Sequence, residues 1–284
     1  MLNYLNNIEL FELLSFFLGL IVGSFLNVCI YRLPRNISII RPSSSCPACN
    51  TPIKPWDNIP VLSYIFLRGK CRKCGKRISI RYPLVELLNG IFYLAVFQFF
   101  GFGFHLPFLF AFASAMIVIT LIDLDFQIIH DAITLPGIVI GLIGASFLLP
   151  DPFLNGLNEL NNLNKLGVNT VQTVQNVQIV GFKNSIAGLF LGGGLFYLIA
   201  ILSRGGMGGG DIKLMAMVGA FMGWKAIFLT TFIGSLVGSV VGIFLMVFKG
   251  KGRKTKIPFG PFLALGSIIT LFFGGEILRW YFRM

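Results

Sequence analysis

Carboxylates at the ends of apolar segments are the residues of this chain whose type and spacing point most directly to chemistry. Asp123 and Asp125 close the run LIDLD, Asp131 follows after a short turn, and Asp211 ends the glycine-rich run GGMGGGD. A carboxylate at or within a membrane segment is costly, so its default interpretation is functional. Two carboxylates held close together cannot both ionise, which leaves one as a base and the other as a proton donor. Such a pair can activate a water against an amide bond and protonate the leaving nitrogen.

The surroundings of Asp211 suit the approach of an extended chain. Three glycines precede it and carry no Cβ, so a substrate backbone could come close to the carboxylate. A lysine two residues later would add local positive charge. The residues expected to support a substrate in this way are Gly208, Gly209, Gly210 and Lys213.

Other interpretations of these acids stay open from the residues alone. Asp211 and Asp131 are placed to N-cap the helices that follow them, and Asp125 could simply be solvated at the membrane interface. The same acids could instead relay ions or protons in a transporter. His130 could assist a reaction, or it could be an ordinary polar residue of the turn.

Two CxxC pairs form the second chemical feature of the chain. Each pair can fold as a tight knuckle that points two thiolates at one metal ion, and two knuckles give the closed tetrahedral site of a structural zinc. Asn50 and Gly75 directly follow the pairs and tolerate the left-handed turn that a knuckle needs. Two disulfides or a redox-active pair are the alternatives, but a cytoplasmic location keeps thiols reduced and favours zinc. The predicted ligands are Cys46, Cys49, Cys71 and Cys74.

The elements that must position these residues are membrane helices. The chain has 284 residues, of which 55% are hydrophobic and only 12% are charged, and its mean hydropathy is +0.82. This composition excludes an ordinary soluble domain and a disordered chain. Apolar stretches predict an all-α polytopic membrane protein with about eight transmembrane helices, near 10–31, 83–101, 104–122, 133–149, 184–202, 212–223, 226–248 and 258–278. The stretch 212–223 is too short to cross an average bilayer upright, so it is expected to be tilted, half-embedded or longer than these bounds.

The distribution of cations predicts how these helices are oriented. Lys and Arg cluster in segments 34–82 and 249–256, which the positive-inside rule places in the cytoplasm. The N-terminus and the Asn-rich segment 150–183 then lie outside, and the latter could form a short strand pair or a surface flap. Both groups of aspartates lie at the cytoplasmic face. The net charge of +12 therefore encodes orientation and contact with the lipid bilayer, and no nucleic-acid partner is expected.

Six motifs in order resemble the bacterial type IV prepilin peptidases. They are GSFLNVCIYRLP at 23–34, SSCPAC at 44–49, DNIPVLSYIFLRGKCRKCGKRISIRYPLVE at 57–86, LIDLDFQIIHDAITLP at 121–136, GGGDIKLMAMVGAFMGW at 208–224 and IPFGPFLALG at 257–266. The resemblance covers nearly the whole chain except the N-terminal residues and the segment 150–183. That long segment departs from the family pattern, as does His130, which stands where many members have a proline.

The resemblance implies a GxGD-type aspartic protease of the bacterial inner membrane. Its substrates would be prepilins and type II pseudopilins, cut on the cytoplasmic side after a glycine that follows a short basic leader. Carried over by motif position, the catalytic pair is Asp123 and Asp211, with Asp125 and Asp131 in supporting or structural roles.

The resemblance also implies a second activity. Longer members of the family N-methylate the newly exposed residue with S-adenosylmethionine, and they carry the cysteine-bearing loop seen in this chain. No glycine-rich nucleotide-binding fingerprint is present in the sequence. The residues of the first loop and its flanks at which we expect this activity are Asn27, Gly69, Arg81, Tyr82 and Glu86. Asn27 could instead form an interhelical hydrogen bond, and Glu86 could pair with an arginine.

Three parts of the chain follow from these expectations. We expect a first transmembrane helix at 1–33, a cytoplasmic zinc-binding loop associated with methyl transfer at 34–82, and a transmembrane peptidase domain at 83–284 that carries the outer-loop insertion 150–183.

Overall fold

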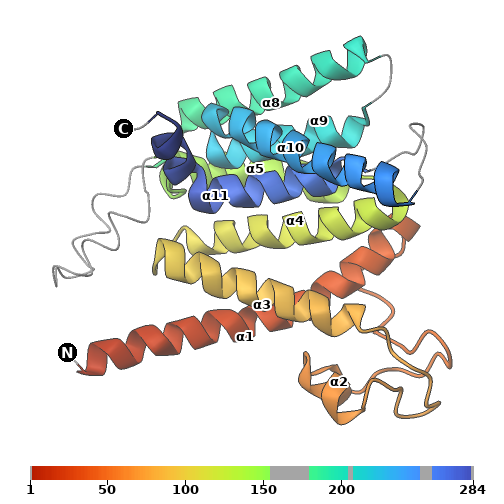
Figure 1. Cartoon of the computed structure of the whole chain (residues 1–284). Helices are drawn as coiled ribbons and strands as arrows, with labels where there is room; N and C mark the ends of the chain where they lie inside the picture. Colours follow the sequence, from red (N-terminus) through yellow and green to blue (C-terminus); the bar gives the residue numbers. More distant parts are fainter. Residues whose placement is uncertain (1, 154–178, 204–206, 250–257, 283–284) are drawn as a thin grey trace. The chain divides into compact units, whose positions relative to one another are not determined.

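The computed structural model describes residues 2–153, 179–203, 207–249 and 258–282. Within these ranges the chain forms helices joined by loops, with isolated β-bridges but no strand, which confirms the predicted all-α class. Each predicted apolar segment is a helix (Figure 1), and these helices are α1 (Leu2–Arg32), α3 (Arg81–Phe100), α4 (Leu106–Phe126), α5 (Asp131–Phe147), α8 (Phe182–Leu202), α9 (Gly209–Met222), α10 (Trp224–Lys249) and α11 (Gly260–Phe282).

Helix length supports six of the eight predicted membrane spans. Among the described residues, α1, α3, α4, α8, α10 and α11 are long and apolar enough to cross a bilayer. The other two helices have 17 residues (α5) and 14 residues (α9), whereas an upright span needs about 20. Eight crossings therefore stay a prediction.

The chain divides into two compact units, Met1–Phe102 and Gly103–Met284. This division groups α3 with α1 and the cysteine-bearing loop. The three-part functional division at residues 33 and 82 stays a prediction. The predicted strand pair or flap falls mostly on residues 154–178, and most of the cation cluster at 249–256 falls on residues 250–257; both lie outside the described residues.

In the first unit, small residues bring α1 and α3 into close contact. A Cβ on Gly19 would lie 2.7 Å from the Cα atom of Gly90, and one on Gly23 would lie 2.7 Å from the Cα atom of Glu86. The Asn89 side chain donates a hydrogen bond of 2.7 Å to the carbonyl of Gly19. Glycines at an interface let two helix backbones approach, and a buried polar group between them finds a partner across the contact.

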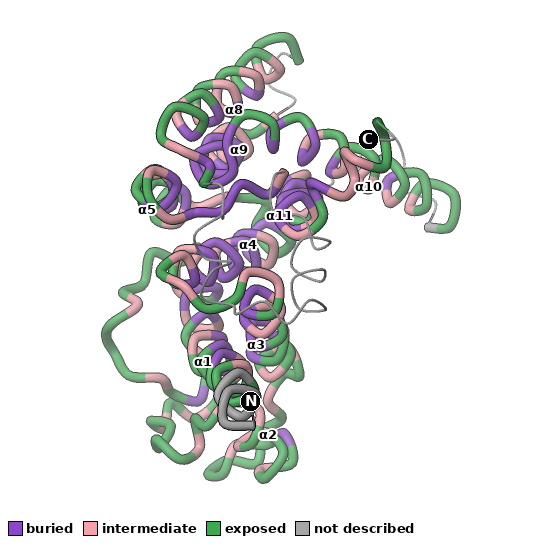
Figure 2. Tube along the Cα trace, turned by 90° about the vertical axis from the view of Figure 1, so that its left-hand side faces the viewer, coloured by how far each residue is buried: buried purple, intermediate pink, exposed green. Residues whose placement is uncertain are grey.

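In the second unit, α9 is the most deeply buried helix of the described residues. Every residue from Leu214 to Met222 is buried, and Figure 2 shows this buried part of the helix beside α8. Its closest neighbours are α8 and α5. A Cβ on Gly188 of α8 would lie 2.5 Å from the carbonyl oxygen of Gly219, so the two backbones touch. The short α9 is therefore fixed in place by its packing rather than by its length.

The helices α4 and α11 complete the core of the second unit. The described residues of α4 include twelve buried ones, and the Ser267 hydroxyl of α11 donates to the sulfur of Met116 on α4 at 3.2 Å. Thr230 of α10 and Thr270 of α11 form a buried hydrogen bond of 3.1 Å. These contacts hold α11 against α4 and α10 along the middle of the helix.

Candidate functional site

Asp123 is a buried carboxylate near the C-terminal end of α4. Its residue is only 5% exposed, so the carboxylate needs hydrogen-bond donors to offset the loss of water. The backbone N–H of Gly260 donates to it. A Cβ on Gly260 would lie 2.6 Å from Oδ2 of Asp123 and 3.2 Å from its Cγ atom. Only glycine at position 260 leaves room for this contact.

In the first turn of α11, one backbone N–H has no backbone acceptor, and it donates to Asp123. The first N–H groups of a helix have no partner inside the helix. Pro261 has no N–H, and the amides of Phe262 and Leu263 donate to the carbonyl of Phe259 at 3.1 and 3.2 Å. The remaining N–H is that of Gly260. Asp123 therefore satisfies the N-terminus of α11, and the helix dipole favours its negative charge.

Asp211 lies at the third residue of α9 and outside the six spanning helices. The N-cap is Gly208, so the expectation that Asp211 is the N-cap is wrong. Its carboxyl instead accepts the N–H of Gly208, as the acid of a capping box does. Burial, and then the charge of Asp123, raise the pKa of Asp211 to about 6.

The two carboxylates meet around Ile129. A Cβ on Gly210, next to Asp211, would lie 2.7 Å from the Cβ atom of Ile129, and one on Gly260 would lie 3.0 Å from the Cδ1 atom of the same residue. The charge of Asp123 adds to the effect of burial in raising the pKa of Asp211, which agrees with a position of the two acids near each other. The structure thus places an acid from α4 and an acid from α9 in one site. One proton shared by this pair gives the base and the acid that amide hydrolysis needs.

The glycines before Asp211 have different surroundings. Gly209 is exposed, and a Cβ there would meet nothing within 4 Å, which leaves the open approach expected for a substrate. A Cβ on Gly208 would come no closer than 3.8 Å to the Asp211 carboxyl. At position 210 a side chain is excluded for a different reason, because Ile129 occupies the space beside Gly210.

The remaining polar residues of the turns have structural contacts. Lys213 forms an ion pair with Asp131, with Nζ to oxygen distances of 2.6 and 2.7 Å, so its charge is matched by that acid. The N-cap of α5 is His130, whose Nδ1 accepts the N–H of Ala132 at 3.2 Å, and the expectation that Asp131 is the N-cap is wrong. Asp125 is exposed.

The four predicted cysteine ligands lie together in the first unit. Their sulfur atoms are all within 4.8 Å of one another, and those of Cys46 and Cys74 are 3.9 Å apart. A tetrahedral zinc site with Zn–S bonds of about 2.3 Å has sulfur atoms about 3.8 Å apart. The cysteines are free thiols, so the cluster can hold a metal ion, and the disulfide alternative is not what the structure contains.

Both cysteine knuckles have the predicted backbone. The N–H of Asn50 donates to the carbonyl of Cys46 at 2.8 Å, and that of Gly75 donates to the carbonyl of Cys71 at 2.9 Å. Asn50 and Gly75 have φ angles of 52° and 69°, which confirms the predicted left-handed turns. The hydrogen bond between the Cys49 and Thr51 side chains lowers the pKa of Cys49 to about 6, whereas burial and the neighbouring thiols raise the pKa of Cys74 to about 11.

Comparisons with known proteins show the family of the chain. Residues 17–100 match the bacterial peptidase A24 N-terminal domain, and residues 110–243 match the type IV leader peptidase family. A prepilin leader peptidase/N-methyltransferase of Pseudomonas aeruginosa is 32% identical and covers 100% of this chain and 98% of its own length. The chain belongs to the type IV leader peptidase family. A relative of the same name from Legionella pneumophila is 35% identical, over 93% of this chain and 91% of the relative. Another from Neisseria gonorrhoeae is 34% identical, over 92% of this chain and 90% of the relative.

No solved structure matches this leader peptidase. The family and the named relatives support a prepilin peptidase. They do not favour the alternative hypothesis that the chain is an ion-coupled transporter. The six apolar helices and the family together make it a multi-pass membrane protein.

The residues at which methyl transfer is expected are placed around α1 and α3 of the peptidase. Asn27 of α1 donates to the carbonyl of Tyr82 at 3.1 Å, which confirms the interhelical hydrogen bond. Arg81 and Tyr82 begin α3. Gly69 has a φ of 66° in the loop, where a Cβ would lie 2.9 Å from the hydroxyl of Tyr64, so its role there is to allow a turn against that ring.

Glu86 is buried on α3, and neutral groups bind it. The N–H of Val61 donates to Oε2 at 2.8 Å, and the Ser24 side chain also forms a hydrogen bond with this carboxylate. The guanidinium of Arg32 donates to the carbonyls of Ser38 and Pro42. The structure therefore binds Glu86 through an amide and a hydroxyl, where the sequence suggested an arginine.

The role of Gly260 in the candidate site does not follow from the sequence. The motif IPFGPF is part of the resemblance, but nothing in its residue types indicates a contact with Asp123. The available signal was the Gly-Pro pair, because a proline after the first helical residue leaves a single amide free at the start of the helix.

Proposed function

We propose that this leader peptidase cleaves the basic leader of type IV prepilins and type II pseudopilins, with Asp123 and Asp211 as its catalytic pair. The observation that carries the proposal is the meeting of two carboxylates from α4 and α9, one buried and the other with a raised pKa of about 6. The cut follows a glycine on the cytoplasmic side of the inner membrane, and the N-terminus of the peptidase lies outside.

The pair divides the work of amide hydrolysis. Asp123, held by the Gly260 N–H, acts as the base that takes a proton from water as the water oxygen attacks the scissile carbonyl. Asp211, whose higher affinity for a proton follows from its burial and from the charge of Asp123, gives its proton to the leaving nitrogen. The open space at Gly209 admits the extended substrate backbone.

The position of the acids at helix ends suits the substrate. A basic leader stays in the cytoplasm while the apolar segment behind it enters the bilayer as a helix. The bond between them then arrives at the depth of the ends of α4 and α9. The amides of a helix are already hydrogen-bonded, so the cut requires local unwinding of the substrate.

A second activity and a metal site complete the proposal. The four-cysteine cluster holds a structural zinc that folds the loop at 46–77, since a site closed by four thiolates has no position left for water. The peptidase also N-methylates the new N-terminal residue with S-adenosylmethionine, which is supported by the name shared by its relatives.

The catalytic pair is tested by two conservative substitutions and a control. Asp123→Asn and Asp211→Asn, each co-expressed with a prepilin, should leave the leader uncut while the protein still accumulates in the membrane. The exposed Asp125→Asn is the matched control and should retain most of the cleavage. Full cleavage by either of the first two variants would refute the assigned pair.

A further inference from the structure

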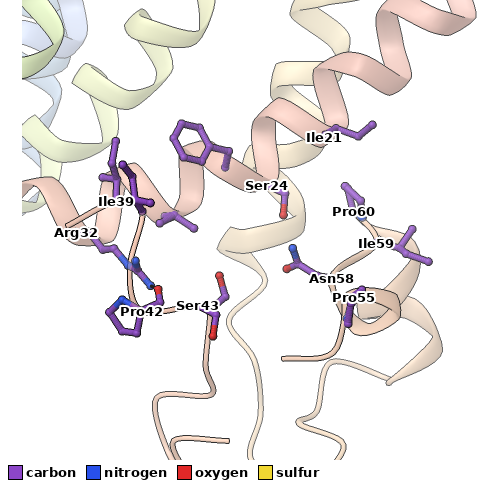
Figure 3. Close-up of a pocket in the computed structure, with 14 residues that line it drawn as sticks. Ile21, Ser24, Arg32, Ile39, Pro42, Ser43, Pro55, Asn58, Ile59 and Pro60 are labelled. Atoms are coloured by element: carbon purple, nitrogen blue, oxygen red, sulfur yellow. Dashed lines mark hydrogen bonds between the residues drawn. The ribbon is translucent and has the colours of Figure 1, made fainter. Parts of the chain in front are cut away.

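A cavity of about 550 Å³ lies in the first unit, between one face of α1 and two segments of the cysteine-bearing loop (Figure 3). Among its lining residues, all of which lie in the described ranges, Arg32 of α1 carries the only charge and no acid is present. The neutral polar lining residues offer hydroxyl or amide groups, and they are Ser24, Ser43, Ser44 and Asn58. The remaining lining residues are apolar. The cavity therefore suits a ligand that joins an anionic group to an apolar part.

The loop holds the Arg32 guanidinium in place. This group donates to the carbonyl of Ser38 at 2.9 Å and to that of Pro42 at 2.8 Å. Carbonyl oxygens are neutral acceptors, so the two bonds fix the position of the guanidinium without neutralising its charge, and they use two of its five N–H donors. A phosphate is an anion that fits such a group, because a guanidinium can bind it through two parallel hydrogen bonds.

The apolar wall of the cavity continues along one face of α1, away from Arg32. Side chains three or four positions apart lie on the same face of a helix, and the residues that follow this spacing from Arg32 toward the N-terminus are Val28, Phe25, Ile21, Leu18 and Leu14. The last four are 47–61% exposed. The eleven positions from Ile21 to Arg32 correspond to about 16 Å along the axis, which is about half of a hydrocarbon core of about 30 Å. An acyl chain of one leaflet can therefore run along α1 from a phosphate at Arg32.

The loop side of the cavity has the composition of a membrane interface. Ile40 and Ile59 line the cavity and are 82% and 47% exposed, so they are apolar groups that a lipid would cover. Trp56 follows the lining residue Pro55 and is 60% exposed, and the centroid of its ring lies 5.4 Å from Nζ of Lys54. Trp is enriched at membrane–water interfaces, where its ring lies at the level of the headgroups. These residues indicate that the cavity lies at the depth of lipid headgroups.

We propose that this cavity binds an anionic phospholipid. The phosphate accepts hydrogen bonds from Arg32, the hydroxyls of a glycerol headgroup meet Ser43 and Asn58, and one acyl chain lies along α1. Because no acid lines the cavity, the ammonium of a zwitterionic headgroup would have no partner there, which favours phosphatidylglycerol over phosphatidylethanolamine. By the proposed orientation the lipid belongs to the cytoplasmic leaflet, whose surface is negatively charged. The bound lipid joins the cysteine-bearing loop to the membrane.

The test measures lipid binding to the purified full-length peptidase by native mass spectrometry in detergent. Phosphatidylglycerol and phosphatidylethanolamine with the same acyl chains, and water-soluble glycerol 3-phosphate, are titrated separately to give a Kd for each. Arg32→Gln removes the charge, whereas Ser43→Trp fills the cavity and leaves the charge in place. Arg35→Gln is the matched control, because Arg35 is an exposed arginine near the end of α1 that does not line the cavity.

We expect the wild type to bind phosphatidylglycerol at least about tenfold more tightly than phosphatidylethanolamine, since hydrogen bonds between charged groups are strong. Arg32→Gln and Ser43→Trp should each raise the Kd for phosphatidylglycerol by about tenfold or more. Arg35→Gln should change this Kd by less than about twofold, because an exposed charge away from the cavity contributes little.

Three results would overturn the site. An equal loss of binding in Arg32→Gln and Arg35→Gln would show a general attraction of basic residues for anionic lipid. Unchanged binding in Ser43→Trp would exclude the cavity, even if Arg32→Gln disturbs the loop. Binding of glycerol 3-phosphate as tight as that of phosphatidylglycerol would replace the lipid by a soluble phosphate compound. All of these measurements are made without a prepilin, so they leave the proposed peptidase and methyltransferase activities untouched.

Discussion

A single added methyl group at Gly260 should impair the proposed catalytic pair although neither aspartate is replaced. In Gly260→Ala the new Cβ would start 2.6 Å from Oδ2 of Asp123 and 3.0 Å from Cδ1 of Ile129. Atoms cannot stay at these distances, so the start of α11 and the carboxylate must separate. The hydrogen bond from the Gly260 N–H is then lengthened or lost.

The size of the effect follows from that hydrogen bond. A hydrogen bond to a charged group is worth about 1.5–3 kcal/mol, and about 1.4 kcal/mol of transition-state energy corresponds to a tenfold change in rate. If the base must be held in place, kcat falls by about 10- to 100-fold. KM should change little, because the substrate backbone approaches from the side of Gly209.

The assay is cleavage of a purified prepilin by purified Gly260→Ala peptidase in the same detergent or bilayer as the wild type. Gly194→Ala on α8 is the control, since its Cβ would meet nothing within 4 Å. It makes the same chemical change and should leave kcat as it was. A Gly260→Ala variant with wild-type kcat would refute the positioning role. If Gly260→Ala instead lowers the melting temperature and loses both cleavage and methylation, the variant is generally misfolded.

Further predictions concern protons, metal and packing. The folded-state pKa of Asp211 is raised from 3.8 to about 6. The contribution of this group to stability is therefore fully present below pH 3.8 and is lost as the pH rises through about 6. The melting temperature of Asp211→Asn should depend less on pH over this interval than that of the wild type. Metal analysis should find one zinc per chain and almost none in Cys74→Ser, whose loop at 46–77 should become sensitive to protease while the transmembrane helices persist. The buried hydroxyl of Thr134 has no partner in the described structure, and Thr134→Val should raise the free energy of unfolding by about 1 kcal/mol, as measured by thermal unfolding.

Features that depend on local pattern could be predicted from the sequence. Apolar runs located the helices, and the CxxC spacing predicted both the cysteine cluster and the left-handed turns at Asn50 and Gly75. The positions of the acids at helix ends suggested that they could meet, because the counted topology put both turns on one face. These predictions depend on short stretches of chain whose chemistry is nearly independent of what packs against them.

Features that depend on a tertiary contact could not be predicted. The partner of Lys213 is Asp131, and that of Glu86 is the amide of Val61, and both pairs join segments that are distant in the sequence. The N-caps differ from expectation by one residue at His130 and by three at Gly208, since a cap depends on where the helix begins. The link between Gly260 and Asp123 likewise exists only once α11 is placed beside α4.

The way in which Ile129 joins the candidate site has a consequence for inhibition. Asp123 belongs with α4 and α11, whereas Asp211 begins a helix whose backbone touches that of α8. Ile129 packs against Gly210 on one side and Gly260 on the other. A change at this one side chain would therefore disturb the positions of both acids at once. Inhibition that acts through Ile129 needs no charged group that mimics the substrate.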